Sequence, residues 1–163
     1  MDGNAGTFDI NLPLAGSPGI ECRSGGPNGN YLIVFTFANP LTNQPGVTLH
    51  GTATLSSAGF GSDQTQFLIS LTGVANQQNL QISLTNVNDS AGEHSDSIVV
   101  PVGVLIGDVN SSRRVDAADV SFIRQQTLQP ITLSNFRADI NASGRIDAAD
   151  VSVARQQTLT SLP

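Results

Sequence analysis

Two segments of the chain, residues 108–129 and residues 139–160, repeat one spacing of oxygen-bearing side chains. Each segment begins with an aspartate, and further aspartate, asparagine and serine residues follow at fixed offsets within a stretch of twelve positions. Calcium is a hard cation that takes about six to eight oxygen ligands, and a tight loop can supply them from alternate positions. The repeated spacing therefore predicts two calcium-binding loops.

The predicted ligands stand at positions 1, 3, 5, 7, 9 and 12 of each loop. Position 7 is an arginine in both copies, and it can contribute its backbone carbonyl while its charge stays away from the ion. The predicted ligands are Asp108, Asn110, Ser112, Arg114, Asp116 and Asp119 in the first loop, and Asp139, Asn141, Ser143, Arg145, Asp147 and Asp150 in the second. Because the pattern occurs twice, 31 residues apart (139 − 108), we expect two bound Ca²⁺ ions.

The two loops differ at position 6, where the chain must turn sharply. Gly144 tolerates a positive φ there, whereas Arg113 in the first loop pays on the order of 1 kcal/mol for the same conformation. We therefore expect the first loop to bind calcium more weakly than the second. Position 12 is an aspartate where an EF-hand has glutamate, so the EF-hand pattern matches only in part.

A helix is predicted after each loop, over residues 117–128 and 148–159, and the first is ended by Pro130. Val115 and Ile146, at position 8, are β-branched and are predicted to pair with each other as a short strand between the loops. The side chains expected to pack between the helices are Val120, Ile123, Thr127 and Leu128 from the first repeat, and Val151, Ala154, Leu159 and the connector residue Phe136.

The stretch VVPVGVLIG before the first loop carries no sign of a helix that enters the loop. Together with the motifs GDVN…RVDAADV and ADIN…RIDAADV, each followed by a helix, residues 107 to about 160 resemble a type I dockerin. This resemblance implies a small all-α module over residues 107–163 that docks onto a cohesin-like protein in cellulosome-type assemblies. It also implies two equivalent faces related by a pseudo-twofold axis. The residues that match the family's contact positions are Ala117, Ala118, Arg124 and Gln125 in the first repeat, and Ala148, Ala149, Arg155 and Gln156 in the second.

Residues 1–106 have a different composition, rich in Thr, Ser, Asn, Gln, Val, Leu and Gly. Apolar side chains alternate with polar ones in short runs separated by turn residues, which indicates strands with one buried face. The runs cover residues 8–14, 31–37, 52–55, 67–71, 80–84 and 98–102. The run at 31–37 is more continuously apolar than the others and is predicted to be a central strand covered on both sides. YLIVFTFANP and NLQISLTNVNDSAG resemble a bacterial immunoglobulin-like domain. The predicted fold class is therefore an all-β immunoglobulin-like sandwich over residues 1–106, followed by a separate small all-α dockerin-like module over residues 107–163.

The charge of the chain is uneven. Residues 1–106 contain one arginine and seven acidic residues, which gives a charge of −6, whereas residues 107–163 contain six of each and would reach +4 with two calcium ions. The acidic balance excludes a nucleic-acid partner, and no apolar run is long enough to span a membrane. Low-charge calcium sites suit external calcium, so we expect part of a larger secreted or cell-surface bacterial protein that begins upstream of Met1.

Nothing in the sequence places a catalytic site. Glu93, His94 and Asp96 are near neighbours that alternate in direction, and Cys22 and His50 have no partner to orient them as a nucleophile and base. We therefore expect a noncatalytic chain. Two alternatives to a cohesin-like partner remain. One is a calcium-stabilised cap that packs on the chain's own neighbouring domain, and the other is a polysaccharide-binding sandwich. Sugar binding usually needs exposed aromatic side chains, and this chain has no tryptophan and a single tyrosine, Tyr31.

Overall fold

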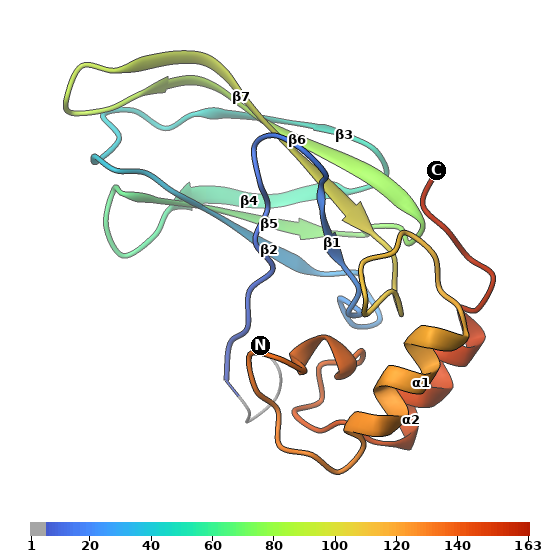
Figure 1. Ribbon diagram of the computed structural model, residues 1–163. Helices are drawn as coiled ribbons and strands as arrows, with labels where there is room; N and C mark the ends of the chain where they lie inside the picture. Colours follow the sequence, from blue (N-terminus) through green and yellow to red (C-terminus); the bar gives the residue numbers. More distant parts are fainter. Residues whose placement is uncertain (1–5) are drawn as a thin grey trace.

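The computed structural model describes residues 6–163, in which a β-rich body is followed by two short helices (Figure 1). The strands are β1 (Gly19–Glu21), β2 (Tyr31–Thr36), β3 (Gly46–His50), β4 (Thr54–Phe60), β5 (Gln66–Thr72), β6 (Gln78–Asn88) and β7 (His94–Val104). The helices are α1 (Ala117–Gln126) and α2 (Ala148–Gln156), with the 3₁₀ turn η2 (Phe136–Ala138) between them. Neither helix of the described residues has the length and hydropathy needed to cross a membrane.

The strands form two layers (Figure 1). One sheet has the order β1-β7-β6-β3 and the other has the order β2-β5-β4. Neighbouring strands are antiparallel except β1, which runs parallel to β7 with Gly19 opposite Val102. Alternate side chains of β5, namely Phe67, Ile69 and Leu71, are buried in an apolar cluster that both sheets share. Burial of this cluster between the layers is the main force that holds the two sheets together.

The structure confirms most of the predicted strands. Those predicted at 31–37, 67–71, 80–84 and 98–102 correspond to β2, β5, β6 and β7. The prediction at 8–14 is wrong, because these residues form no strand. Pro13 lies within this stretch and has no amide to donate to a sheet, although Leu12 still packs against the main apolar cluster.

The strand β2 lies at the edge of its sheet, although its continuous apolar run predicted a central strand covered on both sides. Its outward side chains remain accessible, since Leu32 is 59% exposed and Val34 is 46% exposed. A continuous apolar run therefore does not identify a central strand in this chain.

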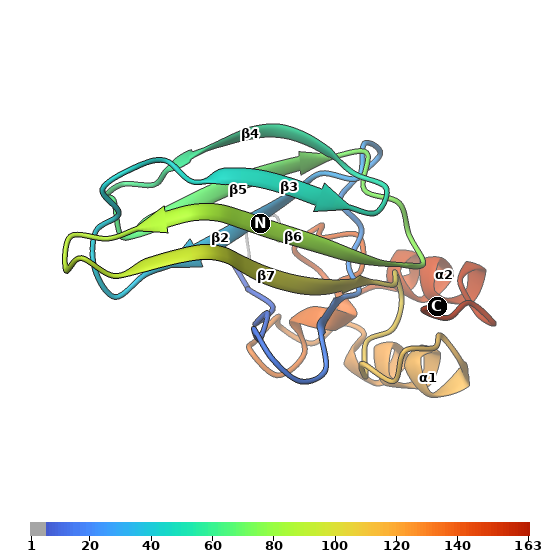
Figure 2. The same cartoon turned by 90° about the horizontal axis from the view of Figure 1, so that it is seen from above.

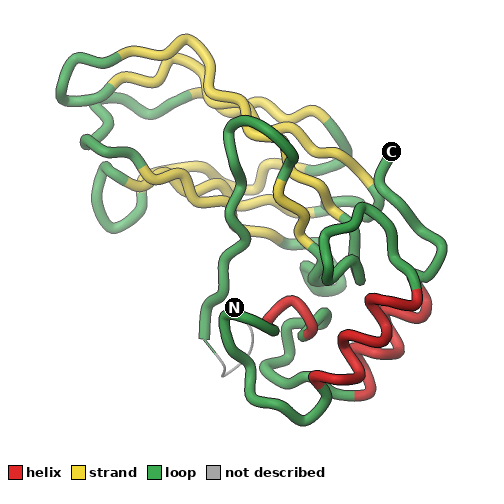
Figure 3. Tube along the Cα trace, in the orientation of Figure 1, coloured by secondary structure: helices red, strands yellow, loops and turns green. Residues whose placement is uncertain are grey.

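The predicted fold class, a separate immunoglobulin-like sandwich followed by a separate all-α module, is wrong. Cys22, which follows β1, is fully buried in an apolar cluster otherwise formed by α1, α2 and the segments around them. Leu162, near the end of the chain, packs with Ile20, Leu105 and Val115. The chain is one mostly β body with two short helices at one end of its sheets (Figures 2 and 3).

Hydrogen bonds also join the two parts of the chain. The Ser24 amide donates to the carbonyl oxygen of Ile140 at 2.6 Å. Asn76 accepts from the Ile106 amide at 2.8 Å and donates to Oε1 of Gln157 at 2.9 Å. These contacts fix the second loop, the start of the first repeat and the end of α2 against the β-rich body.

Candidate calcium loops and docking faces

In the first loop, four predicted ligands are drawn together by hydrogen bonds that they share. The Ser112 amide donates to Oδ1 of Asp108 at 2.8 Å and to Oδ1 of Asn110 at 2.9 Å. The Ser112 hydroxyl donates to the Arg114 carbonyl oxygen at 3.0 Å and lies 3.5 Å from Oδ1 of Asp108. Positions 1, 3, 5 and 7 therefore direct their oxygens to the same part of the loop.

The position-12 side chain, Asp119, joins this group from the first turn of α1. Its Oδ1 accepts from the Asn110 amide at 3.3 Å, and its Oδ2 accepts from the Asp116 amide at 3.0 Å. Asp119 and Asp108 are both fully buried. The loop and the helix that follows it are thus connected through one carboxylate.

The position-9 aspartates cap the helices that follow the loops. Asp116 accepts from the Ala118 amide at 2.8 Å and caps α1, and Asp147 accepts from the Ala149 amide at 2.7 Å and caps α2. Such a cap contributes about 1 kcal/mol to helix stability. At position 9 the ligand often reaches calcium through a water molecule, so capping and second-sphere contact are compatible.

Within residues 6–163, no group of three or more His, Cys, Asp or Glu side chains is gathered as a metal site. The reason is the composition of the loops, since only positions 1 and 12 supply buried carboxylates in each. The remaining converging oxygens belong to an asparagine amide, a serine hydroxyl and a backbone carbonyl, which are neutral calcium ligands.

The second loop repeats the geometry of the first. The Ser143 amide donates to Oδ1 of Asp139 and to Oδ1 of Asn141, both at 3.0 Å. The Ser143 hydroxyl donates to the Arg145 carbonyl at 3.2 Å, and Oδ1 of Asp150 accepts from the Asn141 amide at 3.2 Å. The structure therefore brings positions 1, 3, 5, 7 and 12 together in both loops.

Four buried aspartates lie in the two loops, and none of them forms an ion pair with a cationic side chain of the described residues. They are Asp108, Asp119, Asp139 and Asp150. Burial raises the pKa of Asp108, and the Asp119 carboxylate adds to the rise against the amide hydrogen bonds that lower it. Burial also raises the pKa of Asp150, with Asp139 adding to the effect. A buried charge is costly without compensation, and this oxygen-only donor set fits Ca²⁺.

Both loops turn through residues with positive φ. At position 6, Arg113 has φ of 70° and Gly144 has φ of 86°, which is the left-handed conformation predicted there. Position 4 is left-handed as well, with φ of 60° at Ser111 and 52° at Ala142. The left-handed conformation at position 4 could not be predicted, because neither serine nor alanine favours it.

The predicted pairing between Val115 and Ile146 is wrong. The Val115 carbonyl accepts from the Leu159 amide at 2.9 Å, and the Ile146 carbonyl accepts from the Leu128 amide at 3.0 Å. Each loop is therefore bonded to the residue that follows the helix of the other repeat. This exchange interlocks the two repeats, and it preserves the pseudo-twofold relation between them.

Both helices end earlier than predicted, and this changes the place of two leucines. Leu128 and Leu159 have φ of 68° and 73°, so the helix cannot continue through them. They are 87% and 96% exposed, and the prediction that they pack between the helices is wrong. Val120, Ile123 and Ala154 are buried as predicted.

The residues carried over from the dockerin resemblance are all exposed, and the sheets cover none of them. They are Ala117, Ala118, Arg124 and Gln125 on α1, and Ala148, Ala149, Arg155 and Gln156 on α2. The two helices lie side by side at the end of the molecule (Figures 1 and 2). Each helix thus presents the same four residues to solvent, and an exposed leucine follows the last of them by three residues in both repeats.

The remaining candidates for chemistry do not form a catalytic site. Burial raises the pKa of Cys22 to about 12, so its reactive thiolate is suppressed. His50 is exposed at the end of β3, away from the cluster that encloses Cys22. His94 is exposed at the start of β7, where Nδ1 lies 2.8 Å from Oδ1 of Asn88 and Nε2 lies 2.8 Å from Oδ1 of Asp96.

Comparison with known families agrees with the geometry of the loops. Residues 106–157, about a third of the chain, match the model of the dockerin type I domain. No curated protein matches the chain. Dockerin domains bind calcium, dock proteins without catalysing a reaction, and occur in extracellular or cell-surface bacterial proteins. The chain therefore carries a dockerin type I module near its C-terminus.

Proposed function

We propose that residues 107–163 bind two calcium ions and dock, in their calcium-loaded form, onto a cohesin-like protein. The observation that carries this proposal is the matching convergence of five ligand positions in both loops, next to helices whose contact residues are exposed. A bound calcium ion would supply positive charge against the two buried carboxylates of each loop. Backbone amides of the loops orient the ligand oxygens, and Asp116 and Asp147 cap the helices.

The coupling of calcium to docking follows from where the position-12 side chains lie. Asp119 and Asp150 belong both to the loops and to the first turns of α1 and α2. In the unfolded chain these ligands are not held together, so the free energy of calcium binding becomes free energy of folding. Loss of calcium would therefore disorder the helices that carry the docking residues.

The two repeats offer alternative docking faces to one kind of partner. Arg124 and Arg155 are exposed at equivalent places, as are Leu128 and Leu159. An exposed leucine beside an arginine suits a partner surface with an apolar area and acidic groups around it. If either face suffices, removal of one arginine leaves the other face competent.

A capture experiment with purified type I cohesins, immobilised in calcium, tests this proposal. We expect capture that a chelator reverses. Arg124→Ala together with Arg155→Ala should weaken capture far more than either change alone, with Ser97→Ala, at an exposed place on β7, as the control. Capture that ignores the chelator, or a double variant that binds as well as the parent, would remove the proposal.

A second function, a calcium-stabilised cap on the chain's own sheets, is favoured by the shared packing. Cys22 is buried among the helices, and Leu162 packs on Ile20 and Leu105. We propose that calcium binding also stabilises the β-rich body through these contacts. Thermal unfolding followed by far-ultraviolet circular dichroism should then show the strands unfolding at a lower temperature when a chelator is present. An unchanged unfolding temperature of the strands would reject the cap.

We also propose a secreted or cell-surface bacterial parent protein connected with polysaccharide breakdown, on the strength of the dockerin match. The alternative of a sugar platform on the sheets is not supported at Tyr31. Its hydroxyl accepts from the Gly25 amide at 3.0 Å and donates to the Arg23 carbonyl at 2.9 Å, so the side chain has a structural role.

A further inference from the structure

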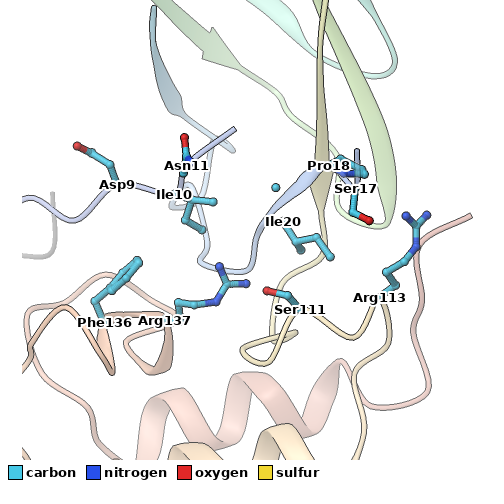
Figure 4. A pocket seen from close by; sticks show the side chains of 11 residues that line it. Asp9, Ile10, Asn11, Ser17, Pro18, Ile20, Ser111, Arg113, Phe136 and Arg137 are labelled. Atoms are coloured by element: carbon cyan, nitrogen blue, oxygen red, sulfur yellow. The ribbon is translucent and has the colours of Figure 1, made fainter. Parts of the chain in front are cut away.

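A cavity of about 380 Å³ lies where the segment before β1 meets the first calcium loop and η2 (Figure 4). Its walls come from residues 9–11 and 17–20, from Ser111 and Arg113 of the loop, and from Phe136 and Arg137 of η2. The volume falls within the range of small-molecule sites, about 300–1,000 Å³. The cavity is separate from the exposed helix faces proposed for docking.

Two arginines line this cavity without a carboxylate partner. Neither Arg113 nor Arg137 forms an ion pair with another described residue. Arg137 is held in place by hydrogen bonds from Nε to the Val109 carbonyl at 2.9 Å and from Nη2 to the Asp108 carbonyl at 3.1 Å. Figure 4 shows its guanidinium extended toward Ser111 and Ile20, into the cavity. A guanidinium has five donors, so donors remain for an anion.

The other walls determine what kind of anion fits. Ile10, Pro18 and Ile20 give an apolar side to the cavity, which an inorganic ion would leave uncovered. Ser111 presents its hydroxyl beside Arg137, and Ser17 adds a second hydroxyl to the wall, so a ligand with hydroxyl groups finds both donors and acceptors. The lining therefore combines one positive end, an apolar wall and a pair of hydroxyl groups.

We propose that this cavity binds a hydroxylated organic acid of about the size of one sugar ring. Its carboxylate would lie on Arg137, with Arg113 at the rim, and its hydroxyl groups would face Ser17 and Ser111. The site is fixed before a ligand arrives, because Arg137 is already anchored to the loop backbone. Such pre-organisation reduces the entropic cost of binding.

Calorimetric titration of the full chain in calcium with D-glucuronate tests the proposal. D-Glucose lacks the carboxylate and acetate lacks the ring and hydroxyls, so both should bind at least roughly tenfold more weakly. Equal binding of acetate and glucuronate would show an unspecific anion contact and overturn the proposal. Equal binding of glucose, or no binding of glucuronate, would overturn it as well.

Variants locate the binding. Arg137→Gln should weaken glucuronate binding by roughly tenfold or more, and Arg113→Gln by a smaller factor. Ser111→Ala should weaken it further than Ser134→Ala, a matched control on the connector outside the cavity. Circular dichroism checks that each variant folds. If Arg137→Gln does not fold, glucuronate binding by Arg113→Gln, which changes an exposed side chain, provides the test. Unchanged binding in Arg113→Gln and Ser111→Ala would place the ligand elsewhere.

Discussion

The two repeats have the same internal geometry in different surroundings. In both loops a serine amide joins positions 1 and 3, and a buried aspartate joins position 12 to the loop. The first loop is also held from outside, because the Leu162 amide donates to the Arg113 carbonyl at 3.0 Å and Arg113 donates to the Pro163 carbonyl at 3.1 Å. At position 6 the second loop has Gly144, which needs no such support. Ligand placement is thus a local property of the repeated sequence, whereas the support of each loop depends on the rest of the fold.

The largest difference between the repeats should come from removal of one position-12 ligand at a time. Asp119→Ala should abolish calcium binding in the first loop and leave the second, and Asp150→Ala should do the reverse. Each variant loses one of two buried carboxylates in its loop. Calorimetry should find one ion per chain in each variant and two ions in Asp63→Ala, whose carboxylate lies in an exposed turn between β4 and β5. Two ions retained after either loop change would contradict the ligand assignment.

Replacement of Cys22 tests whether the helices and the sheets are one body. Cys22→Ser puts a hydroxyl into an apolar cluster and should lower the free energy of unfolding by about 1–3 kcal/mol. Urea unfolding should show the loss in the signals of both strands and helices. Ser97→Ala, at an exposed place on β7, is the control. A loss confined to the helices would mean that the two parts unfold separately.

Alkaline pH should act on the same cluster. Burial raises the pKa of Cys22 from 9.0 to about 12, so the folded state keeps a proton that the unfolded state releases above about pH 9. Stability is therefore full below pH 9 and falls as pH rises toward 12, by about 2 kcal/mol at roughly pH 10.5. The pKa of Tyr31 is raised to about 12 as well, chiefly by burial, and contributes in the same direction.

Cys22→Ala separates the two contributions, because it removes the thiol and leaves Tyr31. Urea unfolding across pH 8 to 10.5 should show a smaller alkaline loss in Cys22→Ala than in the parent chain. The same loss in both proteins would mean that the thiol is not buried in solution.

The smallest expected effect concerns position 6. Arg113→Gly should relieve on the order of 1 kcal/mol of backbone strain and strengthen calcium binding in the first loop about fivefold. Gly144→Arg should weaken the second loop by a similar factor. The measurement is a calcium titration of each variant with the opposite loop disabled. Equal affinities of the two loops before and after the exchange would show that contacts with Leu162 and Pro163 already offset the strain.

The ligand loops could be predicted because their information is local. A twelve-residue spacing sets which oxygens face inward, and the helix that follows is marked by its own capping aspartates, such as Asp116 and Asp147. Most strands could be predicted for the same reason, since alternation along β5 or β6 reflects one buried face.

The relation between the two parts could not be predicted, because it depends on contacts far apart in the sequence. A lone cysteine gave no sign that Cys22 completes the helical cluster, and the predicted separate domains were therefore wrong. Leu128 and Leu159 extend the helical spacing of apolar residues and were therefore predicted to be buried. Each instead adopts a positive φ, its amide bonds to the opposite loop, and its side chain points outward. The hydrogen bonds that join each loop to the leucine of the other repeat could not be predicted, because neither repeat contains a sequence pattern that indicates them.

Diffraction from crystals grown with ample calcium, with anomalous scattering to locate the ions, tests the central claim most directly. The account predicts one ion in each loop, in contact with oxygens of positions 1, 3, 5, 7 and 12. Loops without an ion, or ions held by other side chains, would contradict it.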